Sequence, residues 1–148
     1  EHDLPRNRDD CDVGGELGGS EYLATIHGKV VGSPPACDVE HEKRLIDALL
    51  AAIGDGVISS AHDCSDGGVA VALAESCIAH PEAQRGADID LSALAKMSNR
   101  EILFGESQGR IVVSTKSPER VQEIAANFNV PCRRTGVPIS TDERQPRG

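Results

Sequence analysis

An acidic turn followed by two glycines is the part of this sequence whose residue types and spacing best suit chemistry. Residues 62–68 read His-Asp-Cys-Ser-Asp-Gly-Gly, so two carboxylates and a hydroxyl fall within four positions. Asp63 and Asp66, together with Ser65, are hard oxygen donors of the kind that share Mg²⁺ with substrate phosphates. The turn therefore predicts a corner at which a metal ion and a phosphate group bind together.

Gly67 and Gly68 begin the helix that is predicted to follow this turn. The N–H groups in the first turn of a helix have no partner within it and suit an anion, and glycine lets a ligand approach the backbone closely. A simpler alternative is that Ser65 or Asp66 is an ordinary N-cap and that the glycines are tolerated in the first turn. These residues alone leave both interpretations open.

The cysteines indicate reduced thiols rather than a disulfide framework or a zinc site. Five cysteines occur at irregular spacing, and no Cys-x-x-Cys pair is present. His62 would share a strand face with Cys64, which allows a nucleophilic Cys/His pair. A small buried thiol is the simpler interpretation of Cys64.

The composition describes an acidic chain that is large enough for one domain with its own core. It has 148 residues and a formal net charge of −9, which argues against a nucleic-acid surface, where basic residues must neutralise phosphates. Aromatic residues make up only 2% of the chain, so the core must rest on Val, Ile, Leu and Ala. No stretch approaches eighteen apolar residues, so we expect no membrane span and a cytoplasmic location.

The elements that must position the acidic turn mix helices and strands. Asp38 is the predicted N-cap of a helix through Ile53, and Ser117 caps another with Pro118 at its first position. No strict βαβ repeat is visible, so the sequence predicts an α+β fold, a layered sheet with packed helices. A third helix is predicted over 70–78 and short helical pieces over 92–104, with strands near 57–61, 87–91, 110–114 and 130–135.

The polar sequence at both ends of the chain sets the expected boundaries of the domain. Residues 1–15 are interpreted as a polar N-terminal arm, residues 16–138 as a single α+β domain, and residues 139–148 as a polar tail that is hydrophilic enough to be disordered. Arg133 and Arg134 are interpreted as a charged strand end or rim in preference to a phosphate clamp.

Three blocks of sequence carry a resemblance to a known family. They are Leu-Gly-Gly-Ser-Glu-Tyr-Leu at 17–23, the segment 61–75, and Phe-Gly-Glu-Ser-Gln-Gly-Arg-Ile-Val-Val-Ser at 104–114. In this order and spacing they resemble the last domain of the synthetase subunit in the phosphoribosylformylglycinamidine synthase family, of the aminoimidazole ribonucleotide synthetase superfamily. The resemblance covers about residues 16–137. The acidic segment 9–12 departs from it, because the family has an apolar strand there, and the end lacks the family's closing hairpin.

The resemblance implies the C-terminal-domain fold of that superfamily and an ATP-dependent ligase of purine biosynthesis. Such an enzyme activates the formamide oxygen of formylglycinamide ribonucleotide with ATP, and ammonia from glutamine displaces the phosphate. The implied cofactors are Mg²⁺ and ATP, and the implied partners are the other synthetase domains and a glutaminase subunit or domain. Full-length synthetase subunits of this family contain two ATP-binding-type domains and two domains like this one. Because this chain corresponds to only one of these four domains and has neither common phosphate-binding glycine motif, we expect it to be inactive alone, with no catalytic residue of its own.

The resemblance also suggests roles for individual residues. Asp63, Ser65 and Asp66 match the D-x-S-D-G element by which thiamine-monophosphate kinase holds Mg²⁺ and nucleotide phosphate. The match extends to Gly67.

Two further segments are implied to bind nucleotide or substrate. The triplet Glu106-Ser107-Gln108 matches an E-S-Q element that contacts substrate in the sister domain, although it could merely turn the chain into the next strand. Gly18, Gly19 and Ser20 could form an anion nest, although a plain glycine turn explains them equally well.

Two alternatives to the ligase interpretation stay open. The domain could be a non-catalytic module that packs within the same synthetase. It could also come from a relative of the selenophosphate synthetase or thiamine-monophosphate kinase type.

The position of the motifs allows a geometric prediction. The strand predicted near 57–61 ends at the acidic turn, and the strand near 110–114 starts where the Glu106–Gln108 triplet ends. Adjacent antiparallel strands would bring these two ends together at one sheet edge. We expect that pairing, with the side chains of Asp66 and Gln108 facing one shallow cleft.

Overall fold

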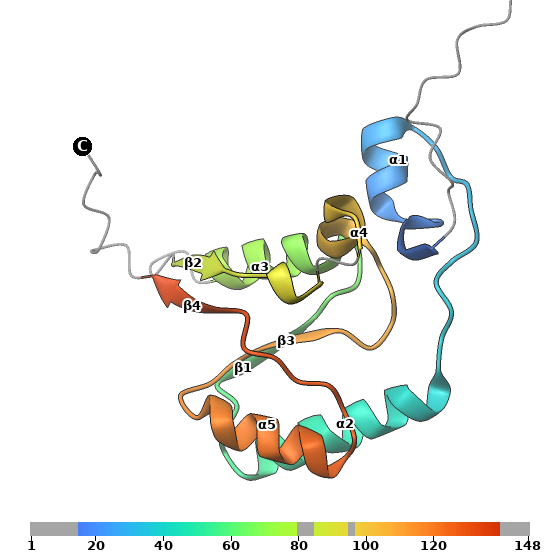
Figure 1. The fold of residues 1–148 in the computed structure, drawn as a ribbon. Helices are drawn as coiled ribbons and strands as arrows, with labels where there is room; N and C mark the ends of the chain where they lie inside the picture. The colour runs from blue at the N-terminus through green and yellow to red at the C-terminus, as the bar shows by residue number, and fades with distance from the viewer. Residues whose placement is uncertain (1–14, 80–84, 95–96, 140–148) are drawn as a thin grey trace, which may run out of the picture.

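The computed structural model shows an α+β chain, as predicted (Figure 1). It describes residues 15–79, 85–94 and 97–139, so most of the predicted arm and tail lies outside the described residues. The elements in chain order are η1 (Gly15–Leu17), α1 (Glu21–His27), α2 (Val39–Gly54), β1 (Ser60–Asp63), α3 (Gly68–Ile78), β2 (Gly86–Ile89), η2 (Ser92–Leu94), α4 (Asn99–Phe104), β3 (Ile111–Ser114), α5 (Pro118–Asn127) and β4 (Gly136–Ile139).

The described strands form two antiparallel ladders of two strands each. β1 pairs with β3, with Ser60 opposite Ser114 and Asp63 opposite Ile111. β2 pairs with β4, with Gly86 opposite Ile139. The expected sheet is therefore divided into two short ladders within the described part of the chain.

The β1–β3 ladder lies between two groups of helices (Figure 1). On one side α2 packs against α5, and on the other α3 packs against α4. α1 lies beyond α4, and the β2–β4 ladder lies near α3 (Figure 1). Among the described helices, none has both the length and the apolar content that a membrane crossing requires.

The two helices on the α2–α5 side begin where the sequence predicts. Asp38 is the N-cap of α2, and its Oδ1 accepts a hydrogen bond from the N–H of His41 at 3.0 Å. Pro118 occupies the first position of α5, although the Ser117 side chain makes no capping bond. Ala48 of α2 and Ala125 of α5 meet in the core.

The apolar stripe of α2 is wider than the surface that covers it. Ala48 and Ala52 are buried, as is typical of the inner face of an amphipathic helix. Ile46, Leu50 and Ile53 remain 53%, 61% and 50% exposed. These three apolar side chains therefore lie outside the face of α2 that packs in the core.

Two predicted strands are displaced along the chain. The strand predicted over 130–135 is wrong, because Pro131 offers no N–H to a ladder. The pairing with β2 begins only at Thr135, whose carbonyl accepts a hydrogen bond from the N–H of Asp90 at 2.6 Å. The strand predicted near 57–61 lies at 60–63, because the carbonyl of Val57 accepts instead from the Thr115 hydroxyl at 2.6 Å.

Candidate functional site

The acidic turn and the Glu106–Gln108 triplet meet at one end of the β1–β3 ladder. Asp63, the last residue of β1, lies opposite Ile111, the first residue of β3. The contact continues past the strands, because the N–H of Cys64 donates to the carbonyl of Arg110 at 2.8 Å. The predicted antiparallel pairing is confirmed.

The N-terminus of α3 is capped from a distant part of the chain. Its N-cap residue is Gly67, which has a φ of 78° and no side chain to offer. The acceptor is Oε1 of Glu106, which receives the Gly67 N–H at 2.8 Å. The interpretation of Ser65 or Asp66 as an ordinary N-cap is therefore wrong, since neither side chain supplies the capping bond.

Glu106 also holds α1, and so connects the three sequence blocks. The same Oε1 accepts from the N–H of Glu21 at 2.9 Å, at the first residue of α1. The N–H of Glu106 donates to the carbonyl of Glu16 at 3.1 Å. A carboxylate beside two helix N-termini is favourable because each carries a partial positive charge. The structure gives Glu106 the role of orienting its neighbours, whereas its predicted contact with a ligand stays a prediction.

Gly68 permits the close contact between the acidic turn and the segment before β3. Its φ is 67°, and a Cβ placed there would lie 2.6 Å from the carbonyl oxygen of Gly105 and 2.9 Å from that of Leu103. Because both neighbours are backbone atoms, only glycine fits without a shift. This contact explains Gly68 without a ligand.

The Gly18–Ser20 turn uses its N–H groups within the chain. A Cβ on Gly18 would collide with the carbonyl oxygen of Ser33. The N–H of Gly19 donates to Val31 at 2.9 Å, and the N–H of Ser20 donates to Leu17 at 3.1 Å. Ser20 is buried and is the N-cap of α1. These bonds leave neither N–H for an anion, so a glycine turn describes this segment better than a nest.

The side chains predicted to bind the metal ion are exposed. Asp63, Ser65 and Asp66 lie at the surface, and in the described part of the chain neither carboxylate forms a hydrogen bond or an ion pair. No group of three or more His, Cys, Asp or Glu residues suited to a metal ion occurs among the residues that the structure describes. The two carboxylates are therefore free for an external ligand but do not make a metal site by themselves.

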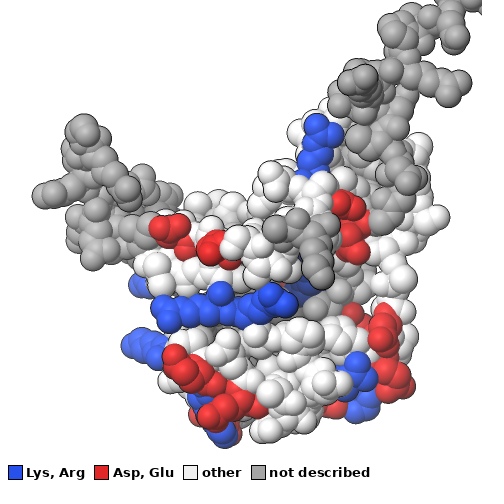
Figure 2. All heavy atoms as spheres, in the orientation of Figure 1, with Lys and Arg blue, Asp and Glu red and all other residues white. Residues whose placement is uncertain are grey.

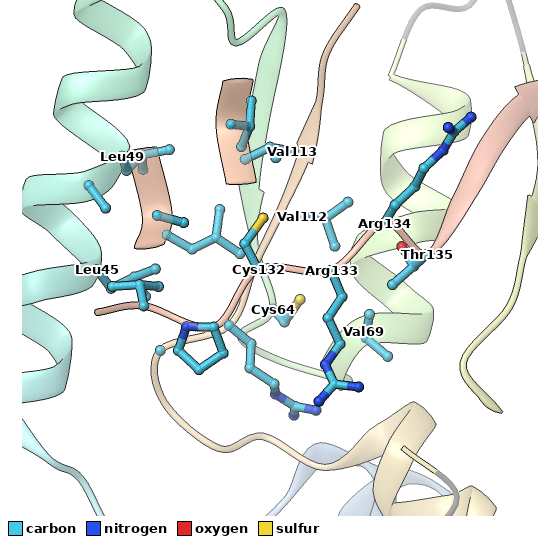
Figure 3. Close-up of a pocket in the computed structure, with 18 of the residues that line it drawn as sticks. Leu45, Leu49, Cys64, Val69, Val112, Val113, Cys132, Arg133, Arg134 and Thr135 are labelled. Atoms are coloured by element: carbon cyan, nitrogen blue, oxygen red, sulfur yellow. The ribbon is translucent and has the colours of Figure 1, made fainter. Parts of the chain in front are cut away.

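Gln108 lines a cavity that does not include Asp66. The cavity has a volume of about 480 Å³ (Figure 3). Gln108 is exposed at its edge, beside the half-buried Ser107. The expected common cleft of Asp66 and Gln108 is not found at this cavity, although their two loops meet at the same ladder end.

Cys64 and His62 do not form a nucleophilic pair. Burial raises the pKa of the Cys64 thiol, which disfavours the thiolate form that a nucleophile needs. The Nε2 atom of His62 lies 2.8 Å from Oε2 of Glu75, on α3. Cys64 is thus a buried core thiol, as the simpler interpretation predicted.

Arg110 was not singled out from the sequence, yet it stabilises the segment that carries Glu106. Its Nη2 donates to the carbonyl of Gly105. The sequence signal is weak, because an arginine at the start of an apolar strand is ordinarily taken as a solvated strand end.

Comparisons with known proteins place the chain in a family. Residues 13–143 match the family model described as AIR synthase related protein, C-terminal domain. Phosphoribosylformylglycinamidine synthase subunit PurL of Caldanaerobacter subterraneus subsp. tengcongensis is 46% identical over 126 residues, which cover 83% of this chain and 16% of that protein. The chain therefore spans about a sixth of the length of this curated relative.

Two solved structures from Thermotoga maritima are similar in fold. PurLQS matches with a TM-score of 0.65 and 29% identity, over 83% of this chain and 21% of that chain. PurL complexed with ATP matches with a TM-score of 0.63 and 28% identity, over 86% of this chain and 20% of that chain.

Proposed function

We propose that this chain, which belongs to the AIR synthase related C-terminal domain family, is the C-terminal domain of an ATP-dependent ligase. The parent enzyme would convert formylglycinamide ribonucleotide to formylglycinamidine ribonucleotide in purine biosynthesis. The observation that carries this proposal is the 46% identity to a PurL subunit over 83% of the chain. The meeting of the three sequence blocks at Glu106 supports it, because these blocks carried the resemblance.

The acidic turn is the part of the domain that we propose to serve the reaction. Mg²⁺ usually keeps several waters and is held by one or two carboxylates together with phosphate oxygens. Two exposed carboxylates beside one hydroxyl fit that donor set, although they do not complete it. Asp63 and Asp66 would hold the ion, and Ser65 would assist. When bound, Mg²⁺ would neutralise charge on the phosphates of ATP.

Outside the Gly18–Ser20 turn, the remaining predicted residues divide into two groups. We propose that Ser107 and Gln108, which lie beside the acidic turn, offer hydrogen bonds to substrate or nucleotide. Gly67, Gly68 and Glu106 would act by fixing the geometry of the turn, since their contacts lie within the chain.

The other partners follow from the length of the relatives. Because the chain covers 16% of the PurL subunit, we propose that the other synthetase domains supply the rest of the ATP and substrate contacts. A glutaminase subunit or domain would supply ammonia, and the reaction would take place in the cytoplasm. The likeness to PurLQS supports an assembly with further subunits.

We expect the 148-residue chain alone to release no ADP from ATP, with formylglycinamide ribonucleotide, ammonia and Mg²⁺ present. The reason is that two exposed carboxylates do not form a complete nucleotide site. The measurement is a coupled ADP assay on the chain and on the full-length parent, with a cooperative thermal transition as the control for folding. ATP turnover by the chain alone, or a parent without ATP-dependent amidine formation, would contradict the proposal.

A further inference from the structure

A second site candidate is the cavity of about 480 Å³, which adjoins the acidic turn at Cys64 and Gln108 (Figure 3). Its walls come from α2 and α5 on one side and from α3 and β3 on the other. Neither Asp63 nor Asp66 lines it. The volume is that of a pocket for a small organic molecule. Its interior is mainly aliphatic, with walls that include Leu45, Leu49, Val69, Leu73, Val112 and Val121.

Three arginines line this apolar cavity, in a chain whose net charge is −9. Within the described residues, Arg110, Arg133 and Arg134 form no ion pair; the ion pairs there involve other side chains. Figure 2 shows basic side chains in a band across the middle of the molecule, with acidic groups above and below it. The described part of the cavity thus has a positive edge whose three arginines form no ion pair.

The orientation of the two neighbouring arginines differs. In Figure 3 the Arg133 side chain extends past Cys64 toward Val69, whereas the Arg134 side chain extends away from Cys64. Asp90 is the acidic residue among the described lining residues, and its Oδ1 accepts from the N–H of Ser92 at 2.8 Å. Arg133 is therefore the better placed of the two for a ligand inside the cavity.

Arg110 supplies an independent sign of a missing acceptor. One of its guanidinium nitrogens donates to the carbonyl of Gly105, but its Nε is buried and has no hydrogen-bond partner. A buried N–H of a charged group without an acceptor is costly, so each such group calls for an explanation. An oxyanion that reached Arg110 from the cavity would give its guanidinium group an acceptor.

We propose that this cavity binds an organic phosphate, with its phosphate group held by Arg110 and Arg133 and its apolar body in the aliphatic interior. Planar guanidinium groups present paired N–H donors that match phosphate oxygens, and these charge-assisted bonds are strong. A phosphate ester has enough terminal oxygens to accept from two guanidinium groups at once. The site needs no metal ion, which separates it from the acidic turn.

The test is calorimetric titration of the 148-residue chain with phenyl phosphate in a buffer that contains EDTA. Saturable binding is expected, with inorganic phosphate and phenol each binding more weakly because each lacks one half of the ligand. Arg133→Gln should weaken binding by about tenfold or more, the effect of losing a hydrogen bond from a charged group. Arg134→Gln removes the same charge from the adjacent position and should change the affinity much less.

The control for folding is the thermal transition, which both substitutions should leave unchanged because both side chains are exposed. Equal losses in Arg133→Gln and Arg134→Gln would overturn the proposal, since net charge alone would then explain binding. Inorganic phosphate that binds as tightly as phenyl phosphate would overturn it too, as would the absence of saturable binding. In a parallel titration with Mg²⁺ in place of EDTA, binding that occurs only there and is abolished by Asp63→Asn would place the phosphate at the acidic turn instead.

Discussion

Gly68→Ala is expected to destabilise the domain by about 3 kcal/mol or more, the combined effect of a strained backbone and a steric overlap. Gly68 has a φ of 67°, which an L-residue adopts only at a cost. The new Cβ would lie 2.6 Å from the carbonyl oxygen of Gly105. Neither Gly105 nor Leu103 can yield by a rotamer change, because the opposing atoms belong to the backbone. The turn and the segment before β3 would have to separate.

The measurement is urea unfolding of the wild-type chain and of two alanine variants. Gly54→Ala is the matched control, since Gly54 is the last residue of α2 and a Cβ there meets no atom within 4 Å. That substitution should be neutral or stabilise by about 0.5–1 kcal/mol, because alanine loses less conformational entropy than glycine. Gly68→Ala that unfolds at the same urea concentration as Gly54→Ala would contradict the described contact.

Glu106→Ala is expected to lower the free energy of unfolding by about 2–4 kcal/mol, since two hydrogen bonds to a charged acceptor are lost. Its Oε1 accepts from Glu21 and Gly67, whose N–H groups lie at the starts of α1 and α3. Glu106→Gln keeps an oxygen that can accept these bonds but loses the charge that the helix N-termini favour. Its effect should therefore be intermediate.

Thermal and urea unfolding of both variants would measure this order. Glu123→Ala is a suitable control, because Glu123 is an exposed carboxylate on α5 that pairs with Arg120 at 3.0 Å. Surface substitutions of that kind usually change stability by less than about 0.5 kcal/mol. If Glu106→Ala were as mild as Glu123→Ala, the bonds to α1 and α3 would not hold the motifs together.

Local signals in the sequence predicted where α2 and α5 begin, whereas the short helix α1 was not predicted. Asp38 and Pro118 mark the starts of α2 and α5 because a cap and a first-turn proline act within a few residues. The antiparallel meeting of the acidic turn with the Glu106–Gln108 triplet was also predictable, since it followed from where each strand ends.

Contacts between residues far apart in the chain could not be predicted from such local signals. Glu106 caps a helix whose N-cap lies 39 residues earlier and another that begins 85 residues earlier, so no local pattern reveals its role. The exposure of Ile46 and Leu50 depends on where α5 packs, which the period of α2 does not specify. The segment 130–135 has strand-forming residues, yet Pro131 lacks the N–H that a ladder would need.

The most direct test of the proposed ligase role is the Mg²⁺ dependence of formylglycinamidine ribonucleotide formation by the full-length parent carrying Asp63→Asn or Asp66→Asn. Each substitution should raise the Mg²⁺ concentration needed for half-maximal activity by about tenfold, as expected when a charged ligand is lost. In the isolated chain, Asp63→Asn should change stability by less than about 1 kcal/mol, because this carboxylate is exposed and forms no hydrogen bond or ion pair with the described residues. Asp88→Asn, at an exposed aspartate on β2, should leave the Mg²⁺ dependence unchanged. A Mg²⁺ dependence identical to wild type in both Asp63→Asn and Asp66→Asn would contradict the account.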